Sequence, residues 1–182
     1  SDDGTRVYLL QSGSETPATT ATSVVVFDAS ARVFLPALPV PNSLLALPGS
    51  TSEPFAHSMQ MIPSNRLLIT SGGGSYSQLG PVVALDVLTG SATRIAGGQA
   101  KFRVMAQPLL AADGKSVVLV DSNKGLQRID LSRPDPDLVA DRMDEELVHR
   151  QSQVSLSADG KVIYQNSPTP ANVLAFDSQT FL

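Results

Sequence analysis

The sequence contains neither cysteine nor tryptophan, and only 16% of its 182 residues are charged. The lack of cysteine excludes disulfides, thiolate metal sites and a cysteine nucleophile. The 13 Lys and Arg residues form no basic block and the formal net charge is −4, so we expect no nucleic-acid partner and no attraction to an anionic membrane surface. No apolar run approaches the roughly 20 residues of a membrane-spanning helix, so we expect no membrane insertion.

No secretory signal is visible. The absence of cysteine suits a reducing compartment, but many periplasmic and secreted repeat proteins also lack it. The sequence therefore does not distinguish a cytoplasmic from a periplasmic or extracellular location. The first residues, SDDGTRVYLL, begin inside what reads as a folded repeat, so we expect the chain to be a piece of a longer protein.

What the sequence does contain favours an all-β fold. Apolar residues make up 42% of the chain, and Gly and Pro number 13 each, a mixture that suits many short strands joined by turns. Apolar strands follow Asp-Gly at three places: Asp3-Gly4, Asp113-Gly114 and Asp159-Gly160. Asp-Gly is a strong two-residue hairpin signal because glycine accepts a positive φ and Asp can adopt the left-handed region, so we expect hairpin turns there.

The order of turn, strand, variable loop and strand ending in Asp occurs four times. The second copy along the chain is more divergent and has PSNR as its turn, followed by LLIT. The turn residues are Gly4, Asn65, Gly114 and Gly160, so the spacings are 61, 49 and 46 residues. The strand-ending acids are Asp28, Asp86, Asp130 and Asp177, and we expect them to accept backbone hydrogen bonds from the turns that follow. Periods in the forties are typical of β-propeller blades with four antiparallel strands.

On these residues the units resemble blades of β-propellers in the broad YVTN and quinoprotein-like class, whose repeats carry a D-G-K turn before an apolar strand and a D-x-x-T-G turn, here Asp86 to Gly90. The second unit, AHSMQMIPSNRLLITSGGG, also resembles a kelch repeat in its order of strand, turn, apolar strand and adjoining glycines, here Gly72 to Gly74. Kelch blades usually carry a downstream Trp, which this chain lacks. The resemblance implies an architecture and no particular activity.

We expect four units with the approximate bounds 1–41, 42–100, 101–146 and 147–182, containing three, four, four and three strands. The fold class is therefore all-β, a β-propeller with about four blades' worth of four-stranded antiparallel repeats. Propellers close with about 4–8 blades. Either a four-bladed ring closes here with missing strands, or the chain belongs to a larger ring, which we favour.

Polar residues precede the turn in three units, where the first strand of a blade should line the central channel. Ser58, Gln107 and Gln153 each lie seven positions before the turn residue, and basic residues lie slightly earlier. Because equivalent strands converge on the propeller axis, we expect a polar ring that either binds a small anionic or polar ligand or only solvates a water-filled channel. The residues of this candidate ring are His57, Arg103, Gln107, His149, Arg150 and Gln153.

No motif predicts a catalytic residue, a metal site or a cofactor. The loop SGGGSYSQLG lacks the lysine of a phosphate-binding loop, and DSNKG lacks the glutamate of a calcium loop, so we interpret both as hairpin loops. The stretch RPDPDLVADRMDEELVHR is either a helix that begins near Pro136 or an outer strand, DLVADRM, which the repeat favours. In ARVFLPALPVPNSLLALPGSTSEP five prolines predict a surface loop between blades, with Leu35, Leu38 and Val40 packed beneath it.

Two functions from different classes remain open. The leading hypothesis is a non-enzymatic scaffold, a structural or interaction module whose partner is a protein or the remaining blades of the same propeller. The alternative is a propeller enzyme or enzyme subunit with its site at the central channel, which would need four or more ionisable groups converging there. Few acids occupy the inner-strand positions, which favours binding over catalysis.

Overall fold

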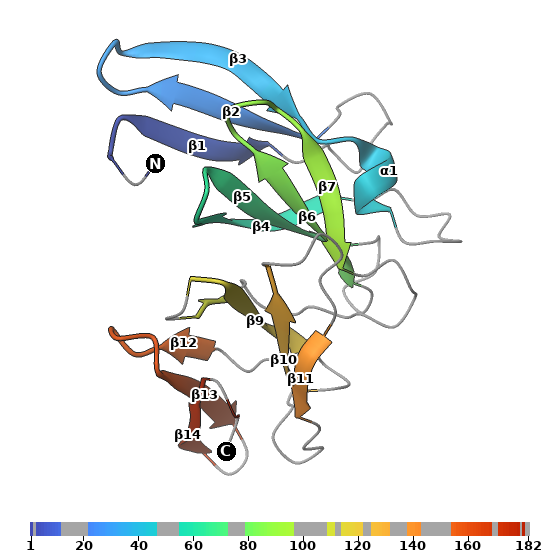
Figure 1. Ribbon diagram of the computed structural model, residues 1–182, viewed down its shortest axis with the longest axis vertical. Helices are drawn as coiled ribbons and strands as arrows, with labels where there is room; N and C mark the ends of the chain where they lie inside the picture. Colours follow the sequence, from blue (N-terminus) through green and yellow to red (C-terminus); the bar gives the residue numbers. More distant parts are fainter. Residues whose placement is uncertain are drawn as a thin grey trace. The chain divides into compact units, whose positions relative to one another are not determined.

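The strands of this computed structural model follow the repeat of the sequence. The structure describes residues 1, 3–11, 22–46, 55–72, 79–96, 109–111, 114–121, 125–131, 138–142, 154–168, 171–178 and 180. The chain divides into two units, Ser1–Lys101 and Phe102–Leu182, and each unit contains two antiparallel sheets. The described sheets have three, four, four and three strands in chain order, as the repeat predicts (Figure 1).

The first unit contains the sheets β1-β2-β3 and β4-β5-β6-β7, in which every strand pairs with its neighbour in sequence. The elements are β1 (Arg6–Gln11), β2 (Ser23–Asp28), β3 (Val33–Pro39), α1 (Asn42–Leu45), β4 (Phe55–Ile62), β5 (Arg66–Gly72), β6 (Leu79–Asp86) and β7 (Ala92–Ala96). The short helix α1 follows β3 and precedes β4.

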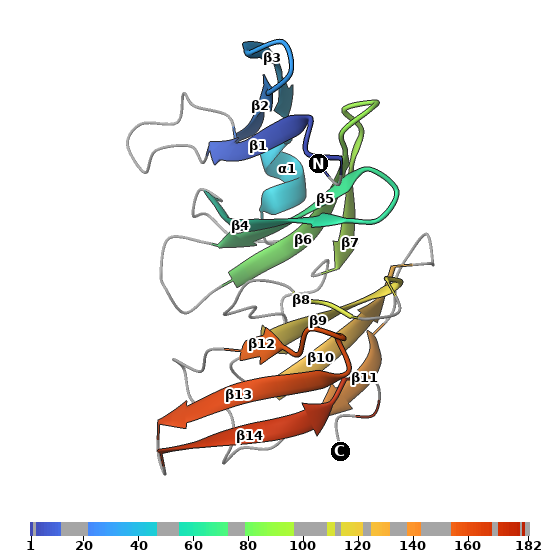
Figure 2. The same cartoon turned by 90° about the vertical axis from the view of Figure 1, so that its left-hand side faces the viewer.

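The second unit contains the sheets β8-β9-β10-β11 and β12-β13-β14 with the same antiparallel meander. The strands are β8 (Leu109–Leu110), β9 (Ser116–Asp121), β10 (Gly125–Asp130), β11 (Leu138–Arg142), β12 (Val154–Leu156), β13 (Val162–Pro168) and β14 (Ala171–Asp177). Figure 2 shows β13 and β14 as a long hairpin beside β12. Strand β11 confirms the strand interpretation of DLVADRM. The residue bounds predicted for the four units stay a prediction.

The four turn residues identified as equivalent share one backbone conformation. Positive φ angles of 70°, 56°, 62° and 68° occur at Gly4, Asn65, Gly114 and Gly160. In the glycine turns the peptide N–H of the glycine bonds to the carbonyl three residues earlier, as from Gly160 to Ser157 at 2.8 Å. The hairpin predicted at Asp159-Gly160 is confirmed, since β12 and β13 pair antiparallel on either side of it. At Asp3-Gly4 and Asp159-Gly160 only the glycine has a positive φ.

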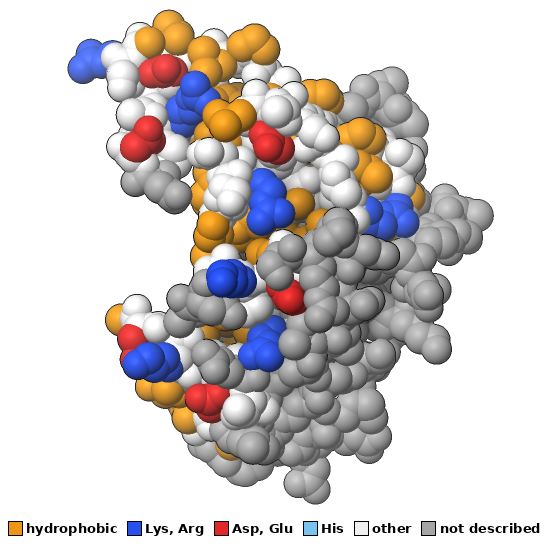
Figure 3. Space-filling model, in the orientation of Figure 1, with side chains coloured by type: hydrophobic (Ala, Val, Ile, Leu, Met, Phe, Trp, Pro, Cys, Tyr) orange, Lys and Arg blue, Asp and Glu red, His pale blue; other side chains and the backbone are white. Residues whose placement is uncertain are grey.

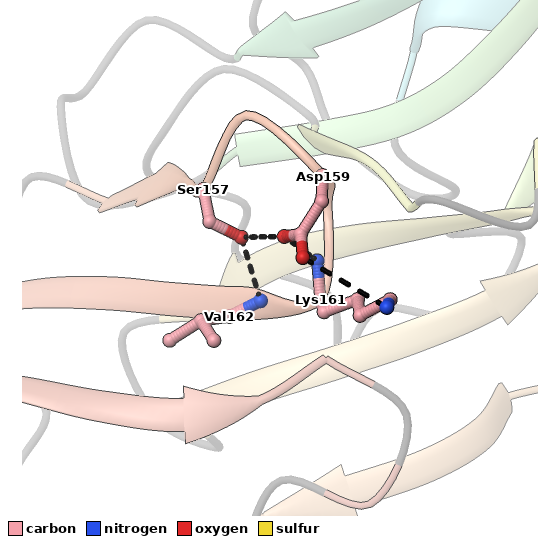
Figure 4. A network of polar contacts seen from close by, with 4 residues as sticks. All are labelled: Ser157, Asp159, Lys161 and Val162. Carbon is pink, nitrogen blue, oxygen red and sulfur yellow. Dashed lines mark hydrogen bonds and ion pairs between the residues drawn. The ribbon is translucent and has the colours of Figure 1, made fainter.

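Side-chain hydrogen bonds hold the turn at Asp159. Its Oδ1 accepts the Ser157 hydroxyl at 2.7 Å and the Lys161 N–H at 3.1 Å, and the Val162 N–H donates to the Ser157 hydroxyl at 2.9 Å (Figure 4). These donors, the Ser157 hydroxyl foremost, lower the pKa of the Asp159 carboxyl. Asp159 thus accepts one backbone N–H and fixes the serine hydroxyl that accepts a second, so it serves the turn itself.

Three of the four strand-ending acids accept hydrogen bonds from the turns that follow them, as predicted. Asp28 Oδ1 accepts the N–H groups of the second and third residues after it at 2.9 and 2.8 Å. Asp86 Oδ1 does the same for Leu88 and Thr89, both at 2.8 Å, and Asp177 Oδ1 accepts the Thr180 N–H at 2.8 Å. These carboxylates therefore have a structural role in closing hairpins.

The proline-rich stretch differs from its prediction. We expected a surface loop, but residues Val33–Pro39 form β3, the outer strand of its sheet. Proline is tolerated there because an edge strand does not need to donate every N–H to a ladder. The predicted packing beneath holds, since Val40 is buried and Leu35 and Leu38 are half-buried.

Candidate functional site

The predicted ring at the channel mouth falls mostly outside the described residues. This applies to Arg103, Gln107, His149, Arg150 and Gln153. The backbone of His57 lies in β4, and its side chain is also outside the described part. The ring therefore stays a prediction.

One position equivalent to that ring is described. The Ser58 hydroxyl lies 2.6 Å from the hydroxyl of Thr70, opposite it on β5. Thr70 is buried, so this polar pair stabilises the sheet from within. In the described residues no group of three or more His, Asp or Glu side chains is placed to hold a metal ion. No described helix is long and apolar enough to cross a membrane.

The described feature that most resembles a binding surface is one face of the β1-β2-β3 sheet. Successive strand residues point to opposite faces, and the register pairs Val7 with Phe27, Leu9 with Val25, and Phe27 with Phe34. These five apolar residues therefore share one side of the sheet, which we call the outer face. Exposed fractions of 45%, 51% and 68% at Val7, Leu9 and Phe34 show that much of this side is open. Figure 3 shows hydrophobic atoms at the surface where β3 runs.

The opposite face of the same sheet is packed. Tyr8, Leu10 and Leu38 contact a buried cluster in the first unit, and Val24 belongs to that cluster. The cluster also contains the β5 and β6 residues Leu67, Ile69, Val83 and Leu85, each at most 2% exposed. The β1-β2-β3 sheet thus has two apolar sides, of which one is buried within its unit and the other, the outer face, is exposed.

The repeat identifies which side of the β4-β7 sheet is equivalent to the outer face of the β1-β2-β3 sheet. Arg6 pairs with Asp28 as Arg66 pairs with Asp86. Counting from these pairs, Val7 and Leu9 correspond to Leu67 and Ile69 on β5. In the same way Val25 and Phe27 correspond to Val83 and Leu85 on β6. The outer face is therefore the counterpart of the side that the β4-β7 sheet buries against β1-β2-β3.

The second unit repeats this relation at its last sheet. Ile163 and Phe176 occupy the positions of Val7 and Phe27, and they are buried in a cluster with Val118 and Leu126 of the β8-β11 sheet. On the other side of the last sheet Tyr164 and Val173 are exposed by 41% and 67%. These two correspond to Tyr8 and Val24. We call the side with Tyr164 and Val173 the second open face.

Two exposed blade faces are expected of an open part of a propeller, but the residues that form them were not identified from the sequence. The signal was present in RVYLLQ and SVVVFD, where apolar residues occupy both alternating sets of positions. Such runs are typical of strands covered on both sides.

The comparisons with known proteins concern the fold. No family model matches the sequence, and no curated protein is similar enough to be matched. Among solved structures, a chain of the mitotic checkpoint complex superposes on 97% of this chain with a TM-score of 0.61 and 14% identity. The Swd1 β-propeller domain of Myceliophteria thermophila covers 94% with a TM-score of 0.54 and 15% identity. The Dos1 propeller covers 87% with a TM-score of 0.53 and 16% identity.

These likenesses confirm a β-propeller fold for the four sheets. This chain covers only 44%, 53% and 37% of the three similar chains, respectively. The fold therefore corresponds to part of a propeller.

Proposed function

We propose that the chain is a structural and interaction module that assembles with further propeller blades through its two open faces. The observation that carries this proposal is the equivalence of Val7 and Leu9 with Leu67 and Ile69. The first pair is about half exposed, whereas Leu67 and Ile69 are 2% and 0% exposed against a neighbouring sheet. At the equivalent positions of the last sheet, Ile163 and Gln165 are 0% and 2% exposed.

A further blade suits the outer face better than a small ligand does. The face is broad, apolar and formed by cross-strand pairs, as expected of a sheet that packs against another sheet. Exposed apolar side chains gathered on one side are typical of an interaction surface. The similar chains are about twice as long, which leaves room for further blades in a complete ring.

The proposal also includes the class of the repeat and a second binding site. The turns at Asp159 and Asp86 support the proposal that the units belong to the YVTN and quinoprotein-like class. The proposal of a kelch-like second unit rests on its sequence alone, AHSMQMIPSNRLLITSGGG. The proposed second binding site is the channel mouth near His57, Arg103, His149 and Arg150, which would take a small anionic or polar ligand.

Site-specific photocrosslinking tests the assembly. A photoreactive phenylalanine analogue at Phe34 would be compared with the same analogue at Leu88, which is 67% exposed in a turn. In cells that make the protein, we expect crosslinks from position 34 to peptides that carry the pattern of Asp-Gly turn, apolar strand and terminal Asp. Crosslinks from position 34 only to proteins without that repeat, or equal crosslinking to repeat-bearing peptides at positions 34 and 88, would contradict the proposal.

A further inference from the structure

One large exposed leucine lies on neither of the two open faces. Leu88 is 67% exposed in the turn between β6 and β7, two residues after the strand-ending Asp86. The sequence has polar residues at this position in the other three units: Ser30, Ser132 and Gln179. A single exposed leucine is common on protein surfaces, but the turn that carries this one and the turn beside it have further features that point to a binding role.

The backbone of the β6-β7 turn is held in place by hydrogen bonds. The N–H groups of Leu88 and Thr89 donate to Asp86 Oδ1, both at 2.8 Å. The Asp86 N–H donates to the Ser91 carbonyl at 2.8 Å, and the Gly90 N–H donates to the Asp86 carbonyl at 2.9 Å. The Ser91 N–H donates to the Thr89 hydroxyl at 3.2 Å. Because this backbone is already fixed, little conformational freedom is lost when another molecule binds the leucine.

The β6-β7 turn is also bonded to the neighbouring β4-β5 turn. The N–H of Val87 donates to the Asn65 carbonyl at 2.9 Å, and Figure 2 shows the two turns side by side at one end of the sheet. We call residues 63–65 and 87–89 together the tip. All residues of the tip except Val87 are exposed, and none carries a charge. The tip is therefore a rigid, uncharged projection with one large apolar side chain.

The β4-β5 part of the tip has an unusual backbone. Ser64 and Asn65 are successive left-handed residues with φ angles of 67° and 56°. The corresponding turns of the other units contain one glycine of positive φ each: Gly4, Gly114 and Gly160. A left-handed residue with a side chain is strained relative to glycine, and such strain is found most often at functional sites. In the described part of the chain, the Ser64 hydroxyl and the Asn65 amide have no hydrogen-bond partner.

We propose that the tip binds a partner protein by inserting Leu88 into an apolar pocket, with Ser64 and Asn65 hydrogen-bonded to uncharged groups at the rim of that pocket. An apolar centre with a polar rim is the usual arrangement of a protein–protein interface. The uncharged tip favours a pocket without charged residues, since a charge buried against it would be left unpaired. This site is separate from the proposed assembly with further blades, because it lies on turns and not on the side of a sheet.

Photocrosslinking in cells that make the protein identifies the partner. A photoreactive leucine analogue at position 88 would be compared with the same analogue at position 30, where Ser30 is exposed and its N–H is bonded to Asp28 in the equivalent turn. We expect position 88, and not position 30, to crosslink to apolar residues of one polypeptide that lacks the repeat. Crosslinks from Phe34 are expected to carry the repeat, so the two proposals are tested separately.

Titration of that purified polypeptide with the 182-residue chain measures the contact. Leu88→Ser should weaken binding about thirtyfold, because an anchor is lost, and should leave the urea midpoint of unfolding unchanged, because the turn uses only the backbone of this residue. Ser64→Gly should weaken binding about threefold to tenfold through the loss of one hydrogen bond, while the midpoint rises as the strain is relieved. Val33→Ser, which removes another apolar side chain that is 47% exposed, should bind like the parent chain.

Four results would overturn the inference. They are equal crosslinking at positions 88 and 30, crosslinks from position 88 to peptides that carry the repeat, unchanged binding by Leu88→Ser, and equal weakening by Leu88→Ser and Val33→Ser. A structural role of Ser64 alone would not produce weaker binding together with greater stability, so the Ser64→Gly variant separates recognition from folding.

Discussion

The rings of Phe27 and Phe34 face each other across β2 and β3, with centroids 5.1 Å apart and planes inclined by 57°. Phe27 is half-buried and Phe34 is 68% exposed. A tilted pair of this kind contributes about 0.5–1.5 kcal/mol beyond its area, yet most of the Phe34 ring remains in contact with water. The pair therefore places an aromatic contact where the proposed blade would pack.

Replacing Phe34 should cost the isolated chain little. We expect Phe34→Ala to lower the free energy of unfolding by about 0.5–1.5 kcal/mol, the contribution of the ring pair. The control is Phe176→Ala, at an equivalent of Phe27 that is only 6% exposed, which should cost about 3–5 kcal/mol. Urea unfolding of both variants measures the difference. Equal costs would show that the outer face is already covered.

The backbone at Arg32 should be strained relative to its equivalent. Arg32 lies four residues after Asp28, as Gly90 does after Asp86, and their φ angles are 56° and 72°. A left-handed residue with a side chain costs about 1–2 kcal/mol, more than the entropic penalty of glycine, about 0.5–1 kcal/mol. Arg32→Gly should therefore raise the free energy of unfolding by about 0.5–1 kcal/mol.

The reverse change at Gly90 is the matched control. A Cβ there would lie 3.7 Å from Leu38 Cδ2, which is ordinary contact, so only the backbone conformation opposes it. We expect Gly90→Ala to lower the free energy of unfolding by about 1 kcal/mol. Thermal unfolding of the two variants should shift in opposite directions, and a shift in the same direction would contradict the equivalence.

Positions set by local chemistry were predictable from the sequence. The turn residues Gly4, Asn65, Gly114 and Gly160 share a positive φ because the turn imposes it on each copy. The Asp caps followed from the same local rule. Strand β3 was not predictable from Pro36 and Pro39, since whether a proline-bearing strand is tolerated depends on its being at an edge, which is a property of the assembled sheet.

The candidate sites depend on contacts between sheets, which cannot be predicted from the sequence alone. Alternation alone places Val7 and Leu9 on one side of β1, but their exposure depends on whether another sheet covers them. The polar ring at His57 and Arg103 was inferred from the repeat alignment, and it remains a prediction for the same reason.

Arg94 should hold α1 against the β4-β7 sheet. Its guanidinium donates to the carbonyls of Ser43, Leu44 and Ala46 at 2.6, 3.0 and 3.1 Å. We expect Arg94→Ala to cost about 1.5–3 kcal/mol, because charge-assisted bonds are lost. Arg94→Lys should recover only part of this, since a lysine lacks the fork.

The control for Arg94 is Thr93→Ala, at the exposed neighbouring position on β7. Amide exchange at Ala46, whose N–H bonds to the Asn42 carbonyl at 2.9 Å, reads the helix directly. That exchange should accelerate in Arg94→Ala and not in Thr93→Ala. If Arg94→Lys were as stable as the parent chain, the positive charge alone, and not the forked geometry of arginine, would account for the stabilisation.

The Asp86 carboxylate should make stability depend on pH in acid. The N–H groups of Thr89 and Leu88 lower its pKa below the ordinary value of 3.8. Because the folded pKa is below the unfolded one, the stabilisation is fully present above pH 3.8 and is lost as the pH falls through the lower folded value. Asp86→Asn keeps an oxygen acceptor but no charge, so it should be less stable than the parent chain at pH 6. Urea unfolding from pH 6 to pH 2 should show this difference shrinking below pH 3.8, and a constant difference would mean that the charge of Asp86 does not stabilise the turn.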